Sequence, residues 1–545
     1  RGLMKNRLGI FLLSSIMIAA LLGGWFGEPL AAGPPLESDT NRLLKTFTAA
    51  LATVQANYVE PVPTEELIES AVRGLLRTLD PHSSFFSVSD YNRLQEEQRG
   101  RYSGLGITIR AESPGSGRVA IVEPPSPGTP AYKVGLRAGD VISKIEGVPI
   151  DDWDLNGDVI PNLKGPKGTA VNITIERPGE PEPIELAVIR DEISMYTIKY
   201  VFRLDDEIGY VRVNKFSETT GGELDDALEK LDEKSLKGLV LDLRDNPGGA
   251  LSQALAVSDS FLRKDQLIVK TRNRSGRGRE YRAEEGSEYE YPMVVLINRN
   301  SASASEIVSG ALQDHDRALI VGETSFGKAL VQTIFTLEGN RGLALTTGRY
   351  LTPSNRLIQR DYADSFYEYY LTRSDNPEAE SRDFQTDSGR TVFGGGGITP
   401  DQEVSMGRYS SLVREIARKR LFVEFSAKLV KGDIRSDTQY QQDREEQLSL
   451  TEEERRKRIE ELAITEETLR LFGDFLREKE VEVTSEGLEE NLPVIANRLM
   501  REVVLSLFGD EESFRIALEI DDQLQEAIQL LPEATALMQK NVSGS

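Results

Sequence analysis

The chain contains no cysteine and only two histidines among its 545 residues. The absence of cysteine excludes disulfide bonds, thiolate catalysis and Cys-based metal sites, and it is compatible with any compartment. His82 and His315 stand far apart in the sequence, so we expect no metal and no cofactor. A net charge of −24 argues against nucleic acid as a partner, because a phosphate backbone would be repelled. The length and a hydrophobic content of 39% indicate three or four domains with real cores.

The first 32 residues have the layout of a targeting segment. Lys5 and Arg7 precede an apolar stretch from Leu8 to Phe26, and Leu30-Ala31-Ala32 then offers small residues for cleavage. The stretch is also just long enough to span a bilayer as an uncleaved anchor. We therefore expect an exported protein, periplasmic or otherwise extracytoplasmic, with residues 1–32 as a signal peptide or a membrane anchor.

The centre of the chain predicts a strand, a helix and a second strand. Met293 to Ile297 is an unbroken apolar run, as in a strand buried on both faces, and the small residues Ser301 to Ser305 open a helix. A second buried strand, Ala318 to Val321, follows. In a right-handed β-α-β unit both strands run the same way, so the segments that follow them emerge at one edge of the sheet. Ser303 and Lys328 should therefore face one another.

A serine hydroxyl needs a base before it becomes a good nucleophile. His315 lies beyond Ser303 by about 18 Å of helix at roughly 1.5 Å per residue, which is out of reach. His82 sits in a polar turn, where a structural role is favoured over a role in a triad. A serine–lysine dyad is the remaining economical interpretation. Since lysine titrates near about 10.4, Lys328 would have to be largely buried to act as a neutral base.

A third loop is predicted at the same edge. Leu239 to Leu243 reads as a buried strand, and Arg244-Asp245-Asn246-Pro247-Gly248-Gly249 follows it. Consecutive glycines let backbone N–H groups approach a ligand closely. Gly248 or Gly249, together with the amide of Ala304, could therefore form an oxyanion hole, although most Pro-Gly-Gly triplets are plain turns.

These segments resemble the carboxyl-terminal processing, or tail-specific, serine proteases over roughly residues 40 to 405. The matching motifs are Asn246-Pro247-Gly248-Gly249, Ser301-Ala302-Ser303-Ala304-Ser305-Glu306, Gly322-Glu323, Phe326-Gly327-Lys328, Val331-Gln332, Thr347, Tyr350, Thr352-Pro353-Ser354 and Gly397-Ile398-Thr399-Pro400-Asp401. The resemblance implies that Ser303 is the nucleophile, Lys328 the general base and Gln332 the residue that orients the lysine. Lys328 and Gln332 would be neighbours in a helical turn but about 13 Å apart in a strand, so this segment must start as a turn.

Residues 100–191 change to short strands with Gly/Pro turns. The predicted strands are Gly106 to Arg110, Val119 to Val122, Asp140 to Ile145 and Ala170 to Arg177. Gly104-Leu105-Gly106-Ile107, with Ala131 to Leu136 and Ala138 to Ile142 downstream, resembles a PDZ domain. Such a loop presents successive N–H groups to a terminal carboxylate, so Leu105, Gly106 and Ile107 are the predicted carboxylate-binding residues. The alternative is a small β-domain that only packs.

The flanking regions read as helical. Residues 38–99 carry apolar residues at helical spacing from Asn41 to Tyr58 and a second helix that Thr64 caps. This arm packs within the protomer or, as the resemblance adds, takes part in a homodimer. Residues 406–545 are charged helices, with a capping box at Thr451 and an apolar face from Asn491 to Leu507. This charged face is a solvated surface or a surface that binds a partner.

Together these features predict a multidomain α/β protein. The serine protease core, residues 192–405, is expected to be crotonase-like, with a β-rich PDZ domain inserted before it, an N-terminal helical arm and a C-terminal α-helical region. The predicted function is an exported serine endopeptidase that cleaves proteins near their C-termini, with a PDZ domain that binds the substrate C-terminus and regulates activity. Two alternatives are a non-catalytic PDZ adaptor or chaperone on the same scaffold, and a crotonase-like acyl-CoA enzyme.

Overall fold

The computed structural model describes residues 38–111, 118–177, 180–204, 207–287, 291–362, 369, 383–407 and 409–543. The chain divides into two compact units, residues 1–79 and 80–545, and each is described by itself. The predicted signal peptide or anchor, residues 1–32, lies outside the described residues. Within the described ranges, no helix is both long enough and apolar enough to cross a membrane.

The described residues of the first unit form two helices, α2 (Ser38–Asn57) and α3 (Thr64–Arg77). Pro63 is the N-cap of α3 and Thr64 is its first helical residue, so the predicted cap at Thr64 is wrong by one position. Apolar side chains of both helices are exposed within the chain. They are Leu43, Leu44, Phe47, Val54, Ile68 and Leu75.

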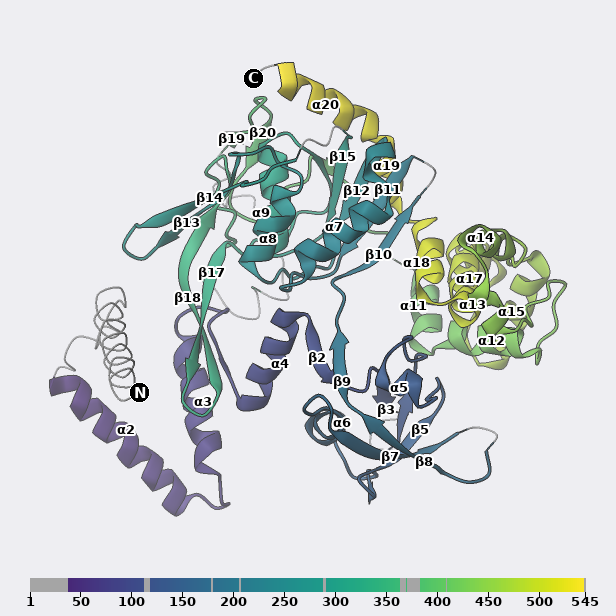
Figure 1. The fold of residues 1–545 in the computed structure, drawn as a ribbon, viewed down its shortest axis with the longest axis horizontal. Helices are drawn as coiled ribbons and strands as arrows, with labels where there is room; N and C mark the ends of the chain where they lie inside the picture. Colours follow the sequence, from purple (N-terminus) through teal and green to yellow (C-terminus); the bar gives the residue numbers. More distant parts are fainter. Residues whose placement is uncertain are drawn as a thin grey trace, which may run out of the picture. The chain divides into compact units, whose positions relative to one another are not determined.

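A six-stranded central sheet organises the second unit (Figure 1). Its order is β10 (Ile198–Arg203), β11 (Ile208–Val213), β12 (Gly238–Asp242), β15 (Met293–Ile297), β16 (Leu319–Gly322) and β21 (Gln402–Glu403). Every neighbouring pair from β11 to β21 is parallel, and β10 is antiparallel to β11. The loops that follow β12, β15 and β16 therefore emerge at one edge, as the sequence predicted.

Both faces of this sheet are covered, because alternate side chains of a strand point to opposite faces. Helices α7 (Thr220–Lys230), α8 (Leu251–Asp259) and α9 (Ala304–Asp314) share one apolar core with the sheet. Helices α19 (Asp522–Gln529) and α20 (Leu531–Ser543) pack on the opposite face. The last two helices of the chain are thus part of the central core, which their sequence did not indicate.

A second sheet borders the first. It contains β1 (Ser84–Phe86), β18 (Arg341–Leu351), β13 (Leu267–Asn273) and β14 (Gly278–Arg282), and β17 (Leu330–Leu337) pairs with β18. The prediction of helices throughout residues 38–99 is wrong at β1, which adds to this sheet before α4 (Val88–Arg99). A small hairpin, β19 (Asp383–Gln385) and β20 (Thr391–Phe393), stands apart from it.

The predicted PDZ region has its own sheet and its own apolar core. The strands are β3 (Ile109–Ala111), β4 (Val119–Ile121), β5 (Val141–Ile145), β6 (Val148–Pro149), β7 (Ala170–Glu176) and β8 (Ile184–Ile189). Two short helices, α5 (Pro130–Lys133) and α6 (Ile160–Leu163), accompany them. The first predicted strand begins at Ile109 rather than at Gly106.

Two paired strands connect this region to the central core. Strand β2 (Arg101–Gly104) enters, β9 (Asp191–Ser194) leaves, and the two pair antiparallel with Gly104 opposite Asp191. The connection is therefore a two-stranded ribbon, because the entering strand is paired with the leaving one.

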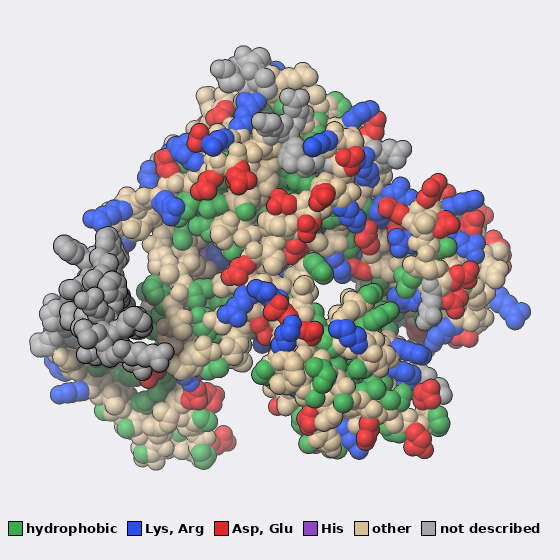
Figure 2. Space-filling view, viewed as in Figure 1, with side chains coloured by type: hydrophobic (Ala, Val, Ile, Leu, Met, Phe, Trp, Pro, Cys, Tyr) green, Lys and Arg blue, Asp and Glu red, His purple; other side chains and the backbone are tan. Residues whose placement is uncertain are grey.

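The remaining C-terminal helices form a separate helical cluster around one apolar core. They are α11 (Ser411–Arg418), α12 (Leu421–Lys431), α13 (Arg444–Ser449), α14 (Glu452–Glu460), α15 (Glu466–Glu478), α16 (Ser485–Glu490), α17 (Leu492–Phe508) and α18 (Asp510–Leu518). The capping box at Thr451 is confirmed, because its side chain accepts from Glu454 N–H while the Glu454 carboxylate accepts from Thr451 N–H. Figure 2 shows acidic and basic side chains intermingled on the surface of this cluster.

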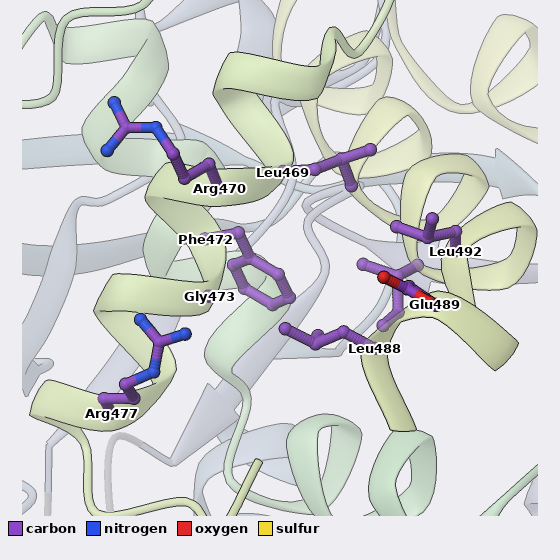
Figure 3. Close-up of a pocket in the computed structure, with 9 residues that line it drawn as sticks. Leu469, Arg470, Phe472, Gly473, Arg477, Leu488, Glu489 and Leu492 are labelled. Carbon is purple, nitrogen blue, oxygen red and sulfur yellow. The ribbon is translucent and has the colours of Figure 1, made fainter. Parts of the chain in front are cut away.

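A cavity of about 220 Å³ lies between α15, α16 and the start of α17. Phe472 and Leu488 face each other across it in Figure 3, and Arg470 and Arg477 lie at its margin. None of the predicted site residues lines this cavity.

Candidate active site

Ser303 is the N-cap of α9, directly after the turn that follows β15. Its backbone has φ 55° and ψ −109°, a conformation that a residue with a side chain adopts only when its surroundings impose it. Ser301 helps to hold this turn, since its Oγ donates to Leu243 O at 2.8 Å and accepts from Asn298 N–H at 2.9 Å. The turn that precedes Ser303 is therefore anchored through Ser301 to the segment that follows β12.

Lys328 lies between β16 and β17, after the left-handed turn at Gly327. Its Nζ donates to Gln332 Oε1 at 3.0 Å. This contact is possible because Lys328 precedes the strand and a bulge interrupts the pairing of β17 at Val331 and Gln332. Burial lowers the pKa of the Lys328 amine, while the carboxylates of Glu306 and Asp80 oppose that effect.

The backbones of Ser303 and Lys328 are held together by shared partners. The Glu306 carboxylate accepts the N–H groups of Ser303 and Lys328 at 2.8 and 2.9 Å. The Tyr350 hydroxyl lies within hydrogen-bond distance of the carbonyl oxygens of the same two residues, at 3.1 and 2.7 Å. Among the hydrogen bonds of the described residues there is none between Ser303 Oγ and Lys328 Nζ.

His82 contributes to this site in a way that the sequence did not reveal. Its backbone carbonyl accepts a hydrogen bond from Gln332 Nε2, and its ring Nε2 pairs with the Tyr369 hydroxyl at 2.8 Å. Burial, followed by the Lys328 charge, lowers the pKa of His82 to about 4, so the ring is neutral near pH 7. Asp80 organises the turn by accepting the N–H groups of His82 and Ser83. The polar composition of this turn was its only sequence signal.

The ring of His315 forms its hydrogen bonds with residues other than Ser303 and Lys328. It is the C-cap of α9, and its two ring nitrogens pair with Asp387 Oδ2 and Leu267 O, each at 2.7 Å. The sequence-based exclusion of His315 as a base agrees with this arrangement.

The glycine loop approaches the nucleophile closely. A β carbon on Gly248 would lie 2.9 Å from Ser303 Cβ and 2.8 Å from Ala304 N, so only glycine fits there. The N–H of Gly248 donates to Asn246 Oδ1 at 2.9 Å. Within the described part of the chain, the N–H groups of Gly249 and Ala304 make no hydrogen bond. This leaves the N–H groups of Gly249 and Ala304, rather than that of Gly248, as candidates for the predicted oxyanion hole.

In the predicted PDZ region, Gly106 and Ile107 line a cleft of about 450 Å³. Its other walls are formed by Tyr102, Thr108, Glu123, Pro124, residues 126–130, residues 191–194 and Tyr196. Leu105 is buried and does not line the cleft, and its carbonyl accepts from Ala131 N–H at 3.0 Å. Gly106 has φ 77°, so the chain turns sharply where a terminal carboxylate is predicted to bind.

Comparisons with known proteins bear on both regions. Residues 207–364 match the model of peptidase family S41, and residues 121–177 match that of the PDZ domain. The carboxy-terminal-processing protease of Bartonella bacilliformis is 40% identical over 64% of this chain and 78% of its own length. The carboxy-terminal processing protease CtpA of Bacillus subtilis is 30% identical over 66% of this chain and 76% of its own length. Among solved structures, the photosystem II D1 C-terminal processing protease is 28% identical, covers 65% of this chain and 86% of its own, and has a TM-score of 0.34.

The two matched regions define a serine-type peptidase that carries a PDZ domain. The chain belongs to the carboxy-terminal processing protease family.

Proposed function

We propose that this peptidase uses Ser303 and Lys328 as a catalytic dyad and cleaves exported proteins near their C-termini. The observation that carries the proposal is the partly buried Lys328 amine, whose pKa burial lowers and which donates to Gln332 Oε1 at 3.0 Å. A neutral amine can take the proton of a serine hydroxyl, whereas an ammonium group cannot. Glu306 and Tyr350 each form hydrogen bonds with the backbones of both Ser303 and Lys328, which further supports the pairing.

The proposed reaction begins when Lys328 Nζ accepts the proton of Ser303 Oγ as the oxygen attacks a substrate carbonyl carbon. The resulting oxyanion accepts hydrogen bonds from the N–H groups of Gly249 and Ala304. The Lys328 ammonium then returns the proton to the leaving amine, and the acyl-enzyme forms. Water, deprotonated by the same lysine, then attacks the ester carbonyl carbon. The bond to Ser303 Oγ breaks, the Lys328 ammonium returns the proton to Ser303 Oγ, and the new C-terminus is released. Gln332 keeps the amine oriented throughout.

The core is proposed to be crotonase-like, as the β-β-α arrangement of its sheet and helices supports. The PDZ domain is proposed to bind the substrate's terminal carboxylate through Leu105, Gly106 and Ile107. The cleft that Gly106 and Ile107 line, and the positive φ of Gly106, support this assignment. Charge-assisted hydrogen bonds to a carboxylate contribute about 1.5 to 3 kcal/mol, or roughly a tenfold to hundredfold preference over a blocked end.

Export is proposed from residues 1–32, through a signal peptide or a membrane anchor, and implies an extracytoplasmic location. A homodimer through the N-terminal arm is proposed as well. Its support is the apolar surface of α2, where Leu43 and Phe47 are 62% and 49% exposed within the chain.

The test of the dyad is turnover of casein and of a C-terminally tailed peptide by the parent, Ser303→Ala and Lys328→Ala. Ser275→Ala is the matched control, because Ser275 is exposed on the β13–β14 turn. Both dyad variants should lose hydrolysis while the control retains it. If both dyad variants hydrolyse substrate like the parent, the assignment is wrong and a PDZ adaptor function becomes the better interpretation.

The test of the PDZ domain uses the ribbon that connects it. Because Gly104 and Asp191 are directly opposite, residues 105–190 can be replaced by a two-residue Asn-Gly turn that closes β2 and β9 as a hairpin. If the domain gates the site, this variant should cleave short unstructured peptides faster than the parent. If it only tethers substrate, KM for tailed proteins should rise and kcat should not. Amidation of the substrate's C-terminus should raise KM or lower kcat, and no change in either would overturn carboxylate binding.

A further inference from the structure

Glu306 is a fully buried carboxylate that the proposed reaction leaves without a role. It stands one turn into α9 and accepts four hydrogen bonds. Its Oε2 accepts from Ser303 N–H and Lys328 N–H at 2.8 and 2.9 Å. Its Oε1 accepts from Ser325 Oγ–H and Gly327 N–H, each at 2.6 Å. One side chain thus binds the backbone of the proposed nucleophile and that of the proposed base.

The donor set matches an ionised carboxylate. An ionised carboxyl group only accepts, and it has about four lone-pair sites, which four donors fill. A protonated carboxyl or an amide would direct a hydrogen at one of these donors. Burial raises the pKa of Glu306 above its usual value, and the four hydrogen bonds offset part of that rise because they stabilise the charged form.

The geometry constrains the dyad directly. Because one oxygen atom accepts both N–H groups, the two backbone nitrogens can be no farther apart than those two bonds together allow. Ser303 also has the strained φ of 55°, and its N–H bond to Glu306 helps to hold that conformation. Loss of these bonds would free the two segments to separate.

We propose that Glu306 is a positioning residue whose ionised carboxylate sets the spacing between Ser303 and Lys328 by binding both of their backbones. This inference rests on the proposed dyad and extends it with a third side chain that touches neither substrate nor the reacting atoms. A displacement of about 1 Å in such a pair can reduce the rate by about a hundredfold.

The same carboxylate also acts on Lys328 through its charge. The negative groups that act on the Lys328 amine are Glu306 and Asp80, and both favour the ammonium form. His82 is neutral above a pH of about 4 and therefore adds no charge near neutrality. Removal of the Glu306 charge should lower the Lys328 pKa further, so the acid limb of the pH–rate profile should move to lower pH.

The test compares Glu306→Gln and Glu306→Asp with the parent, by kcat, KM and the pH–rate profile on a tailed peptide. Glu306→Gln keeps the shape and removes the charge, so kcat should fall by about tenfold to hundredfold, KM should stay within about twofold and the acid limb should move to lower pH. Glu306→Asp keeps the charge but shortens the reach, so kcat should fall while the acid limb stays in place.

Asp314→Asn is the matched control, because Asp314 is a second buried carboxylate on the same helix that bonds Ser354 and Arg356 instead. It should lower the thermal midpoint without moving the acid limb. If Glu306→Gln fails to fold, Glu306→Asp decides, and a kcat within about threefold of the parent overturns the inference. The inference is also overturned if folded Glu306→Gln has the parent's kcat and acid limb. If Lys328→Ala remains fully active, the proposed dyad fails as well, and that outcome is distinct from a failure at Glu306 alone.

Discussion

The loop that carries the glycines is tied to the end of the chain by a buried arginine, and removal of that arginine should both destabilise the protein and slow catalysis. The Arg244 side chain is 6% exposed and donates to Asp242 at 2.7 and 3.0 Å and to Asp521 at 2.9 Å. It also donates to Gln523 Oε1 at 3.0 Å. Asp521 and Gln523 belong to the start of α19, so Arg244 joins the loop after β12 to the C-terminal helices.

Arg244→Met removes the cation and keeps most of the volume. Asp242, which is fully buried, then loses its main partner and keeps the backbone N–H of residue 244 at 2.9 Å, the Tyr210 hydroxyl at 2.6 Å and the longer contact to Arg212 at 3.7 Å. Breaking a buried ion pair from one side costs about 3–5 kcal/mol, because the remaining charge stays buried without compensation. We expect Arg244→Met to lower the free energy of unfolding by that amount at pH 7.

Two further variants calibrate this value. Asp521→Asn removes a partner that is 18% exposed and should cost about 1.5–3 kcal/mol, the range for hydrogen bonds to charged groups. Lys237→Met breaks an ion pair with Glu207 in which both side chains are more than half exposed, and should cost less than about 1 kcal/mol. Urea denaturation followed by far-UV circular dichroism measures all three.

The pH dependence supplies an independent check. Burial alone would raise the pKa of Asp242, but the Arg244 and Arg212 charges outweigh it and the pKa is lowered. A carboxyl with a depressed folded pKa stabilises the protein above its unfolded pKa, and this contribution is lost as pH falls through the folded value. The difference between parent and Arg244→Met should therefore be largest near neutral pH and shrink in acid. A loss below about 1 kcal/mol at pH 7, or a loss that grows in acid, would refute the reasoning.

Three other changes have definite expected outcomes. Activity should rise with pH through a Lys328 pKa below the ordinary lysine value of 10.5, since only the neutral amine accepts a proton. If chemistry is rate-limiting and kcat/KM does not change from about pH 5 to 10, Lys328 is not the general base. Gly248→Ala should reduce kcat at least about tenfold, because its β carbon would lie 2.7 Å from a backbone oxygen, whereas Gly276→Ala, at a similar positive φ in open space, should leave kcat unchanged. Leu531→Ala should cost about 2–5 kcal/mol in urea denaturation because Leu531 packs against the central sheet, whereas Leu505→Ala, at a side chain that is 39% exposed, should cost less than about 1 kcal/mol.

The local sequence pattern correctly predicted segments whose structure depends only on burying their apolar side chains. Met293 to Ile297 is a strand with the predicted bounds, since a short unbroken apolar run has few other solutions. The β-α-β handedness rule then correctly brought the loops that carry Ser303 and Lys328 to one edge.

The local sequence pattern could not indicate which single backbone N–H or carbonyl group makes a given hydrogen bond. Gly248 and Gly249 are equivalent in sequence, yet the Gly248 N–H is already bonded to Asn246 and the Gly249 N–H is not. The carbonyl of His82 accepts a hydrogen bond from Gln332. Every residue has a backbone carbonyl, so the sequence does not indicate which one will accept this bond. The amphipathic spacing of α19 and α20 indicates that these helices need an apolar partner but does not say which one.

The sequence by itself predicted the class of chemistry: with no cysteine and two unsuitable histidines, a serine and a lysine after neighbouring parallel strands were the remaining pair. It also determined which segments form strands, helices and tight turns, because those depend on the period of apolar residues and on glycine. Only the tertiary structure decided how the pair is held. The Glu306 carboxylate reaches from the start of α9 to the Lys328 backbone, and the Tyr350 hydroxyl and the His82 turn contact the proposed dyad from segments that are distant in the chain. Such contacts are set by packing in three dimensions rather than by local spacing.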